Sequence, residues 1–225
     1  MLSYSSSQYQ ELRIIIGAGS QTYDGWIATQ REDLDLLDPT TWERSLRSES
    51  VDAFLCEHVW EHLAEEEGRA AAKLCYQYLK PGGYVRCAVP DGNFRNAEYQ
   101  EIVQVGGNGD PDSPAADHKI LYTHTLLTEV FEDAGFQVRA LEYCTDEGIF
   151  HAFPWSAGDG PIYRSLATDH RNQAGTVQFA SIIIDAIKPL LTAVPDQHYR
   201  ISGYAERVSP PTPSGTRGSS RACSH

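Results

Sequence analysis

Apolar and polar positions alternate along residues 12–188 in a way that predicts an α/β domain. Short β-branched runs such as "LRIII" at 12–16 are typical of buried strands, whereas residues 64–79 repeat apolar side chains at helical spacing. Strands are expected at 12–16, 25–29, 51–56, 84–90, 137–143 and 176–189, and helices at 39–47, 64–79 and 123–136. This alternation favours a mostly parallel sheet with helices on both faces and an antiparallel last strand at one edge.

The connection between the first two strands is unusually short. Only about eight residues separate the run at 12–16 from "GWIAT" at 25–29, and a parallel crossover with its own helix needs a dozen or more. The first crossover is therefore expected to be a loop or a single turn of helix. It begins with Gly17 and Gly19, which allow a backbone to approach a ligand closely after a strand.

The domain organisation follows from where the pattern is interrupted. Residues 1–190 are expected to form one α/β domain, in which the long irregular insertion 144–175 caps the substrate. Beyond it, residues 191–225 contain "VSPPTPSGTRGSSRACSH", which is rich in Pro, Ser and Gly and predicts a disordered tail.

Charge and composition exclude some classes of binding partner. The formal net charge is −13 at pH 7, with no basic stripe, which disfavours nucleic acid and anionic membrane surfaces. No apolar run approaches the roughly 20 residues of a membrane span, so a cytoplasmic protein without membrane contact is expected. The five cysteines are scattered without a C-x-x-C pair, and this favours reduced thiols over a zinc ribbon.

Four segments together resemble a known family. They are "LRIIIGAGSQTYDGWIATQ", "SVDAFLCEHVWEHL", "YLKPGGYVRCAVPD" and "LLTEVFEDAGFQVRALEY", and they occur in the order found in small class I S-adenosylmethionine-dependent methyltransferases. The likeness is strongest to a compact bacterial-type group and spans roughly residues 12–188. The resemblance implies a Rossmann-like fold, S-adenosylmethionine as cofactor and an enzyme that methylates a small-molecule acceptor.

Cofactor-binding residues are carried over from the family by position. Gly17, Ala18 and Gly19 would line the methionine end of the cofactor, and Glu57 and His58 would form a wall of its pocket. Asp38 matches the acidic position near the adenine. The family's acidic residue that holds the ribose hydroxyls is replaced here by Gln30. An uncharged amide makes weaker hydrogen bonds than a carboxylate, so reduced cofactor affinity, or help from a neighbouring acid, is expected.

The stretch "CEHVWEHL" also spells H-x-x-E-H, the inverted zinc-protease motif. In that alternative, His58 and His62 bind a metal on one helix and Glu61 is the base. The apolar strand that continues to Cys56 places His58 at a turn instead. We therefore expect no metal here, and His62 is expected to be a packed, hydrogen-bonded side chain.

Candidates for acceptor chemistry lie in two segments. "DHKILY" at 117–122 supplies His118 as a base and Lys119 and Tyr122 as substrate contacts, with loop fixation as the alternative role of Asp117 and His118. The insertion supplies a second base, His151, and further substrate contacts at Trp155, Arg164 and Arg171. An arginine suits a substrate carboxylate or phosphate, whereas an Arg164–Asp169 ion pair is the structural alternative.

Three functions stay open from the sequence. The first is methyl transfer from S-adenosylmethionine to a small molecule; the family's N/D-P-P-Y motif for nucleobase amines is absent. The second is a catalytically inactive binding module of the same fold, suggested by Gln30 and the short first crossover. The third is a metal-dependent hydrolase that uses His58, Glu61 and His62. The oligomeric state is left open.

Overall fold

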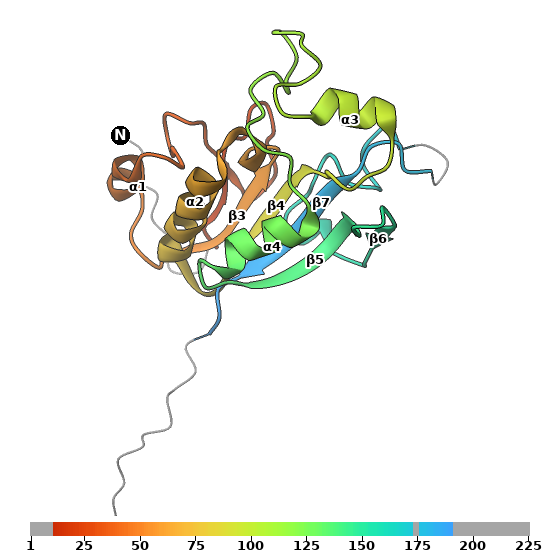
Figure 1. Ribbon diagram of the computed structural model, residues 1–225. Coiled ribbons are helices and arrows are strands. Elements are labelled where there is room, and N and C mark those ends of the chain that lie inside the picture. Colours follow the sequence, from red (N-terminus) through yellow and green to blue (C-terminus); the bar gives the residue numbers. More distant parts are fainter. Residues whose placement is uncertain (1–10, 173–175, 191–225) are drawn as a thin grey trace, which may run out of the picture. The chain divides into compact units, whose positions relative to one another are not determined.

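The computed structural model of the protein describes residues 11–172 and 176–190, which contain one seven-stranded sheet and four α-helices (Figure 1). The strands are β1 (Arg13–Ile15), β2 (Ile27–Ala28), β3 (Val51–Glu57), β4 (Leu79–Pro90), β5 (Gln137–Cys144), β6 (Phe150–Ala152) and β7 (Ser181–Ile187). The helices are α1 (Pro39–Ser45), α2 (Glu65–Tyr78), α3 (Ala97–Val103) and α4 (His124–Glu132), with 3-10 turns η1 (Trp60–His62) and η2 (Ala157–Asp159). The predicted tail at 191–225 lies outside the described residues.

The sheet has the order β2-β1-β3-β4-β7-β5-β6. Pairs from β2 through β4 are parallel, and β7 runs antiparallel to both β4 and β5. The Rossmann-like, mostly parallel sheet and its antiparallel last strand are thus confirmed. The edge placement is corrected, because β7 lies between two strands and β6 forms the edge. Its apolar run, Ile182–Ile184, is buried on both faces, which an edge position in contact with solvent would not provide.

Sequence signals account for most element ends. Asp38 accepts from Thr40 N at 3.0 Å as the N-cap of α1, and Thr123 caps α4 by accepting from Leu126 N. Helix α2 ends at Tyr78, and the chain continues directly into β4 through "KPGG" at 80–83. Helix α3 and strand β6 were not predicted from the sequence. Asn96 caps α3 and is the clearest sequence signal for this helix.

One face of the sheet is covered by helices. Side chains from α1, α2 and α4 form a single apolar cluster with alternate residues of the central strands, including Trp42, Phe54, Ala71 and Phe131. Figure 1 shows α2 and α4 side by side in front of the strands. The periodic apolar residues of the predicted helices therefore build the main core.

The opposite face has no α-helix among the described residues, which corrects the prediction of helices on both faces. Its cluster joins strand residues such as Leu55 and Ile183 to Ile162, with Trp26 and Trp155 packed against it. Because the first crossover is too short for a helix, as predicted, irregular segments cover this face. Residues 144–172 of the insertion supply much of that cover and therefore have a packing role in addition to any role as a cap.

Buried charges hold the insertion on this face. Arg86 on β4 is fully buried and pairs through two hydrogen bonds of 2.7 and 3.0 Å with Asp185 on β7. The same guanidinium donates to Ser156 O at 2.8 Å and Gly160 O at 2.7 Å and lies under the Trp155 ring. One arginine thus satisfies a buried carboxylate and orients the insertion backbone.

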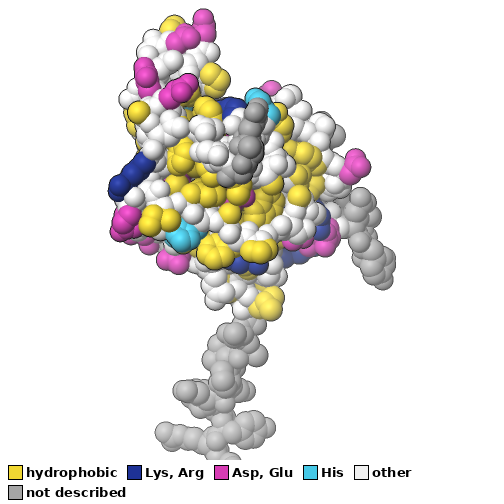
Figure 2. Space-filling model, turned by 90° about the vertical axis from the view of Figure 1, so that its right-hand side faces the viewer, with side chains coloured by type: hydrophobic (Ala, Val, Ile, Leu, Met, Phe, Trp, Pro, Cys, Tyr) yellow, Lys and Arg dark blue, Asp and Glu magenta, His cyan; other side chains and the backbone are white. Residues whose placement is uncertain are grey.

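Hydrophobic side chains are exposed near strand β6. Figure 2 shows hydrophobic side chains gathered on the side where β6 lies in Figure 1. Ile149 and Phe153, which flank β6, are 59% and 49% exposed.

The four described cysteines are buried and unpaired, as expected for reduced thiols, and burial raises the pKa of Cys56. No helix within 11–172 and 176–190 has the length and apolarity needed to cross a bilayer.

We predict that Arg86→Met destabilises the protein by ~3–5 kcal/mol, because it leaves the Asp185 carboxylate buried without its main partner. The matched control is Arg139→Met, since Arg139 also bonds Asp185 but its side chain is 60% exposed. Exposed pairs contribute about 0–1 kcal/mol. Urea unfolding followed by circular dichroism measures both changes, and equal losses in the two variants would contradict this role of Arg86.

Candidate functional site

Two adjoining cavities open where the parallel strands reach their carboxyl ends. Cavity A has a volume of about 380 Å³ and lies beyond β1 and β3. Cavity B has a volume of about 300 Å³ and lies beyond β3 and β4 and beside the start of β7. Ligands of α/β sheets bind in this position, outside the carboxyl ends of the strands.

Cavity A has an apolar wall and a polar rim. Its apolar lining comprises Ile16, Gly17, Leu34, Leu36, Leu37, Val59 and Leu63, and its polar lining comprises Arg31, Asp35, Asp117 and Lys119, with His58 and His62. Gly17 has a φ of +64°, and a Cβ at this position would lie 2.8 Å from Val59 Cγ2. The absence of a side chain at Gly17 is therefore required both by the turn and by the packing beside the cavity.

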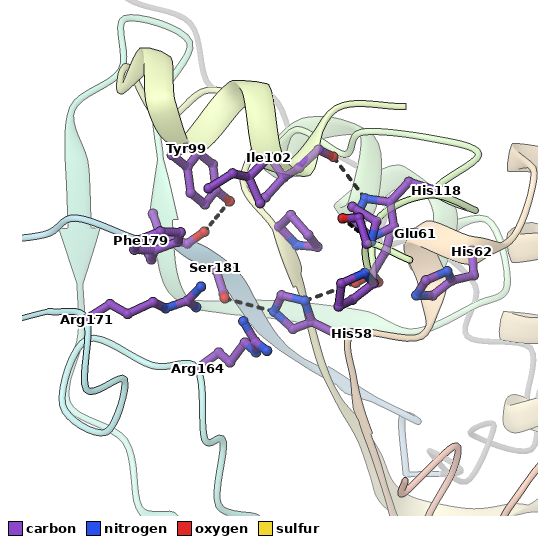
Figure 3. A pocket seen from close by; sticks show the side chains of 16 residues that line it. His58, Glu61, His62, Tyr99, Ile102, His118, Arg164, Arg171, Phe179 and Ser181 are labelled. Carbon is purple, nitrogen blue, oxygen red and sulfur yellow. Dashed lines mark hydrogen bonds and ion pairs between the residues drawn. The ribbon is translucent and has the colours of Figure 1, made fainter. Parts of the chain in front are cut away.

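Cavity B is lined by more polar and aromatic groups (Figure 3). They include His58, Glu61, His62, Tyr99, His118, Arg164, Arg171, Phe179 and Ser181. The Tyr99 hydroxyl donates to Ala180 O and accepts from Asp91 N, which joins α3 to the ends of β4 and β7. Burial raises the pKa of Tyr99 well above its usual value, so this phenol stays protonated near neutrality.

His58 and His62 line both cavities, so the two spaces meet at the end of β3. His58 has a φ of +54°, a left-handed conformation that is rare for a residue with a side chain. Its Nδ1 lies 3.1 Å from Glu61 Oε1, and its Nε2 lies 3.3 Å from Ser181 Oγ. Figure 3 shows the imidazole ring between these two partners. Strained residues of this kind cluster at functional sites.

The H-x-x-E-H spelling does not form the helix that the inverted zinc motif needs. Strand β3 continues to Glu57, His58 occupies the left-handed turn, and only Trp60–His62 form a 3-10 turn. Val59 and Leu63 pack toward the core, as the methyltransferase interpretation expects.

Residues Ala18, Gly19 and Gln30 lie beside cavity A without lining it. The Gln30 side chain donates to Gly19 O at 2.8 Å and accepts from Gly19 N at 3.3 Å. Gln30 thus clamps the glycine turn after β1 through both its amide donor and its carbonyl acceptor. Asp38 is engaged as the cap of α1, whereas Asp35 lines the cavity and carries a carboxylate there.

Glu57 fixes the insertion next to cavity B. Its carboxylate accepts from Arg164 N at 2.7 Å, Tyr163 N at 3.0 Å and Gln21 Nε2 at 2.8 Å. A carboxylate has enough lone pairs for three donors, and charge-assisted bonds are roughly twice as strong as neutral ones. The residue expected in the cofactor wall therefore orients the segment that carries Arg164.

The acceptor candidates divide between the two cavities. His118 lines cavity B, with its Nδ1 2.9 Å from Val103 O, and Lys119 lines cavity A while it pairs with Glu67. Arg164 and Arg171 both line cavity B. The Arg171 guanidinium is bound to Asp169 through Nε and Nη2, so Asp169 pairs with Arg171 and not with Arg164, as the structural alternative had expected.

Three candidates lie away from both cavities. His151 is on β6 and stacks on Tyr143, at 5.4 Å between ring centroids. Tyr122 is buried, and its hydroxyl lies 2.8 Å from where a Cβ on Gly68 would be. Trp155 donates to the Glu142 carboxylate on the helix-free face. The sequence interpretation missed Tyr99 and Ser181, which no motif marks, because only the antiparallel placement of β7 brings Ser181 to the site.

The chain is similar to several known proteins. Residues 26–87 match the family model for a methyltransferase domain. An uncharacterised protein of Saccharomyces cerevisiae, YBR225W, is 27% identical over 138 residues, which are 47% of this chain and 15% of that protein. Similar solved structures include a S-adenosylmethionine-dependent methyltransferase of Archaeoglobus fulgidus (16% identity, TM-score 0.46, 79% of this chain and 86% of that one). Another is a complex of the Haloferax volcanii Trm112 methyltransferase activator with a putative methyltransferase (17%, 0.46, 80% and 83%).

The family match covers only part of the chain. It runs from β2 into β4, within the parallel part of the sheet. The matched segment agrees with the resemblance read from the sequence, and it does not test the compact bacterial-type subgroup. The chain spans only 15% of the length of the yeast protein it matches.

We predict that Glu57→Gln loosens the backbone at Tyr163 and Arg164, because the amide can accept on one side only. Hydrogen bonds to charged groups contribute ~1.5–3 kcal/mol, so exchange of these two amides should accelerate roughly 10- to 100-fold. Hydrogen–deuterium exchange measures this, with exposed Glu132→Gln on α4 as the control. Unchanged protection at 163–164 in the Glu57 variant would show that the carboxylate does not hold the segment.

Proposed function

We propose that this protein transfers the methyl group of S-adenosylmethionine to a small-molecule acceptor, with the cofactor in cavity A and the acceptor in cavity B. The observation that supports this most strongly is the shared lining by His58 and His62. Methyl transfer requires an activated carbon and a nucleophile to meet in line, and two adjoining cavities of ligand size supply that geometry.

The residues of cavity A fit the cofactor. Gly17 lines the cavity at the bend after β1, where the family binds the methionine end of the cofactor, and Ala18 and Gly19 lie beside it. The leucines of the apolar wall suit an adenine ring. Asp35 is the carboxylate that lines the cavity, where it accepts from Arg31 Nε at 2.9 Å and from Leu37 N at 2.8 Å. With its remaining lone pairs it can accept from the ribose hydroxyls, the part that the family gives to the residue at Gln30.

The bound cofactor would supply an activated methyl carbon, and the protein supplies alignment and a base. His58 is the base of choice, because it lies at the junction of the cavities with Nδ1 beside Glu61. The acceptor oxygen or nitrogen forms its bond to the methyl carbon as the carbon–sulfur bond breaks. The acceptor proton passes to His58 Nε2, which gives up its contact with Ser181. Two other histidines were proposed as bases from the sequence. His118 lines cavity B only, and His151 lies outside both cavities.

Arg164 indicates the chemical class of the acceptor. Its backbone is held by Glu57, and its guanidinium has no hydrogen bond or ion pair with any residue in 11–172 or 176–190. Arg171, by contrast, is already neutralised by Asp169. The charge of Arg164 helps to lower the pKa of Asp169, but its guanidinium keeps its donors for a ligand, and a guanidinium at a cavity suits a carboxylate or phosphate. We therefore assign a small anionic molecule as acceptor; the net charge of −13 argues against nucleic acid.

We predict that S-adenosylhomocysteine binds the native protein and that Gly17→Ala weakens this binding about 5- to 100-fold. The added methyl group would push Val59 into cavity A, and overpacking of this kind costs ~1–3 kcal/mol. Gly25→Ala is the control, because Gly25 has a φ of +80° but open space at its Cβ. Isothermal titration calorimetry measures both affinities. Absence of binding to the native protein would favour the inactive binding module instead.

We further predict that Arg164→Gln raises KM for the acceptor ~10- to 100-fold, the effect of one charge-assisted contact. Labelled S-adenosylmethionine incubated with a pool of small carboxylic acids and phosphate esters identifies the products that receive label. Exposed Arg44→Gln on α1 is the control and should leave KM unchanged. Label found only in neutral or cationic products would contradict an anionic acceptor.

A further inference from the structure

The Glu61 carboxylate is buried without a hydrogen bond. Its side chain sits at the cavity B wall at 0% exposure, and neither oxygen has a hydrogen-bond partner among the described residues. His58 Nδ1 lies 3.1 Å from Oε1 but outside hydrogen-bond geometry. The Glu61 backbone is fixed, because its carbonyl accepts from Lys119 N at 2.8 Å. Buried carboxylates are normally paired, hydrogen-bonded or bound to a metal, and this one lacks the hydrogen bonds.

Two histidines lie next to this carboxylate. One ligand atom each from Glu61, His62 and His118 falls within 4.8 Å of the others. The two imidazole rings meet edge to face, with centroids 5.0 Å apart. The three residues come from η1 and from the D-H-K segment, which the contact between Lys119 N and Glu61 O holds together.

Each histidine has an oxygen beside one ring nitrogen. His118 Nδ1 lies 2.9 Å from Val103 O, and a carbonyl only accepts, so Nδ1 carries the proton and Nε2 carries the lone pair. His62 Nδ1 lies 2.8 Å from Asp117 Oδ1, an ion-pair contact outside hydrogen-bond geometry, so here only the position of the ring is restrained. No described residue hydrogen-bonds the second nitrogen of either ring. Histidines that bind metals have such outer partners, which fix the tautomer and strengthen the ligand.

From this geometry we infer a divalent transition-metal site formed by Glu61, His62 and His118, with zinc as the preferred ion. Two imidazoles and one carboxylate suit zinc, and three protein ligands leave a fourth position open. Ligand atoms around tetrahedral zinc lie about 3.4 Å apart, so the side chains close by roughly an ångström on binding. This is a different ligand set from H-x-x-E-H, since His58 is not a ligand, and it departs from the expectation of no metal.

The open position faces cavity B, because all three ligands line that cavity. The open position would bind a water molecule or an oxygen of the acceptor. Only the binding of the acceptor rests on the proposed function. Metal binding itself needs neither cofactor nor acceptor. The site and the methyl transfer can therefore fail separately.

The test uses the untagged full chain, stripped with chelator, loaded with zinc chloride and dialysed. About one zinc per chain should remain, and Glu61→Gln and His118→Gln should each hold less than about a tenth of that amount. His124→Gln is the matched control, because His124 stacks on Tyr143 outside the cluster. Equal zinc in native and variant proteins, or no zinc in the native protein, would overturn the site.

Thermal unfolding and a cobalt absorption spectrum distinguish the loss of a metal ligand from misfolding of the variant. Zinc at about 100 times its Kd should raise Tm of the native protein by roughly 5 °C or more and leave Tm of Glu61→Gln unchanged. Substituted cobalt should give d–d bands of nitrogen and oxygen coordination. An intense thiolate charge-transfer band would instead assign the ion to a cysteine and overturn the proposal.

Discussion

The helix-free face of the sheet is the constraint on which the rest of the structure depends. The first crossover is too short to place a helix there, so irregular chain must cover strand residues such as Leu55. Irregular chain has unpaired backbone groups, and buried charges satisfy them here. Arg86 donates to two insertion carbonyls, while Glu57 accepts two insertion amides. Glu142 accepts another, and its burial raises its pKa despite the hydrogen bonds that Leu166 N and Trp155 donate.

This covering also builds the site. Glu57 is the last residue of β3, and the next residue, His58, takes the left-handed conformation that places its ring between the cavities. The carboxylate that fastens the insertion and the imidazole at the junction are thus adjacent in sequence. Packing of the helix-free face and geometry of the site are therefore expected to change together when either residue is replaced.

Periodicity predicted most of the fold, because amphipathic helices and buried strands have local signatures. It placed α2, α4 and the central strands, and the short spacing predicted the loop between β1 and β2. It failed for the position of β7, since pairing between distant strands leaves no local signal. It also failed for the three-residue strand β6. The assumption of helices on both faces came from the fold class and not from residues in this chain.

The site was predictable where a residue follows a strand directly. Gly17 and His58 were found in this way, and both line cavity A. Asp35, which also lines cavity A, was missed because the family pattern selects Gln30, and the bond of Gln30 to Gly19 is a tertiary contact. His151 was selected as a histidine in the insertion, yet β6 directs it to Tyr143. The cluster of Glu61 and His118 joins residues far apart in sequence and is visible only in the fold.

A crystal structure of the protein with S-adenosylhomocysteine bound is the most direct test of the two-cavity site. We expect the ligand in cavity A, with its sulfur near Gly17 and the vacant methyl position directed past His58 into cavity B. Ligand bound in another place, or a sulfur turned away from His58, would contradict it.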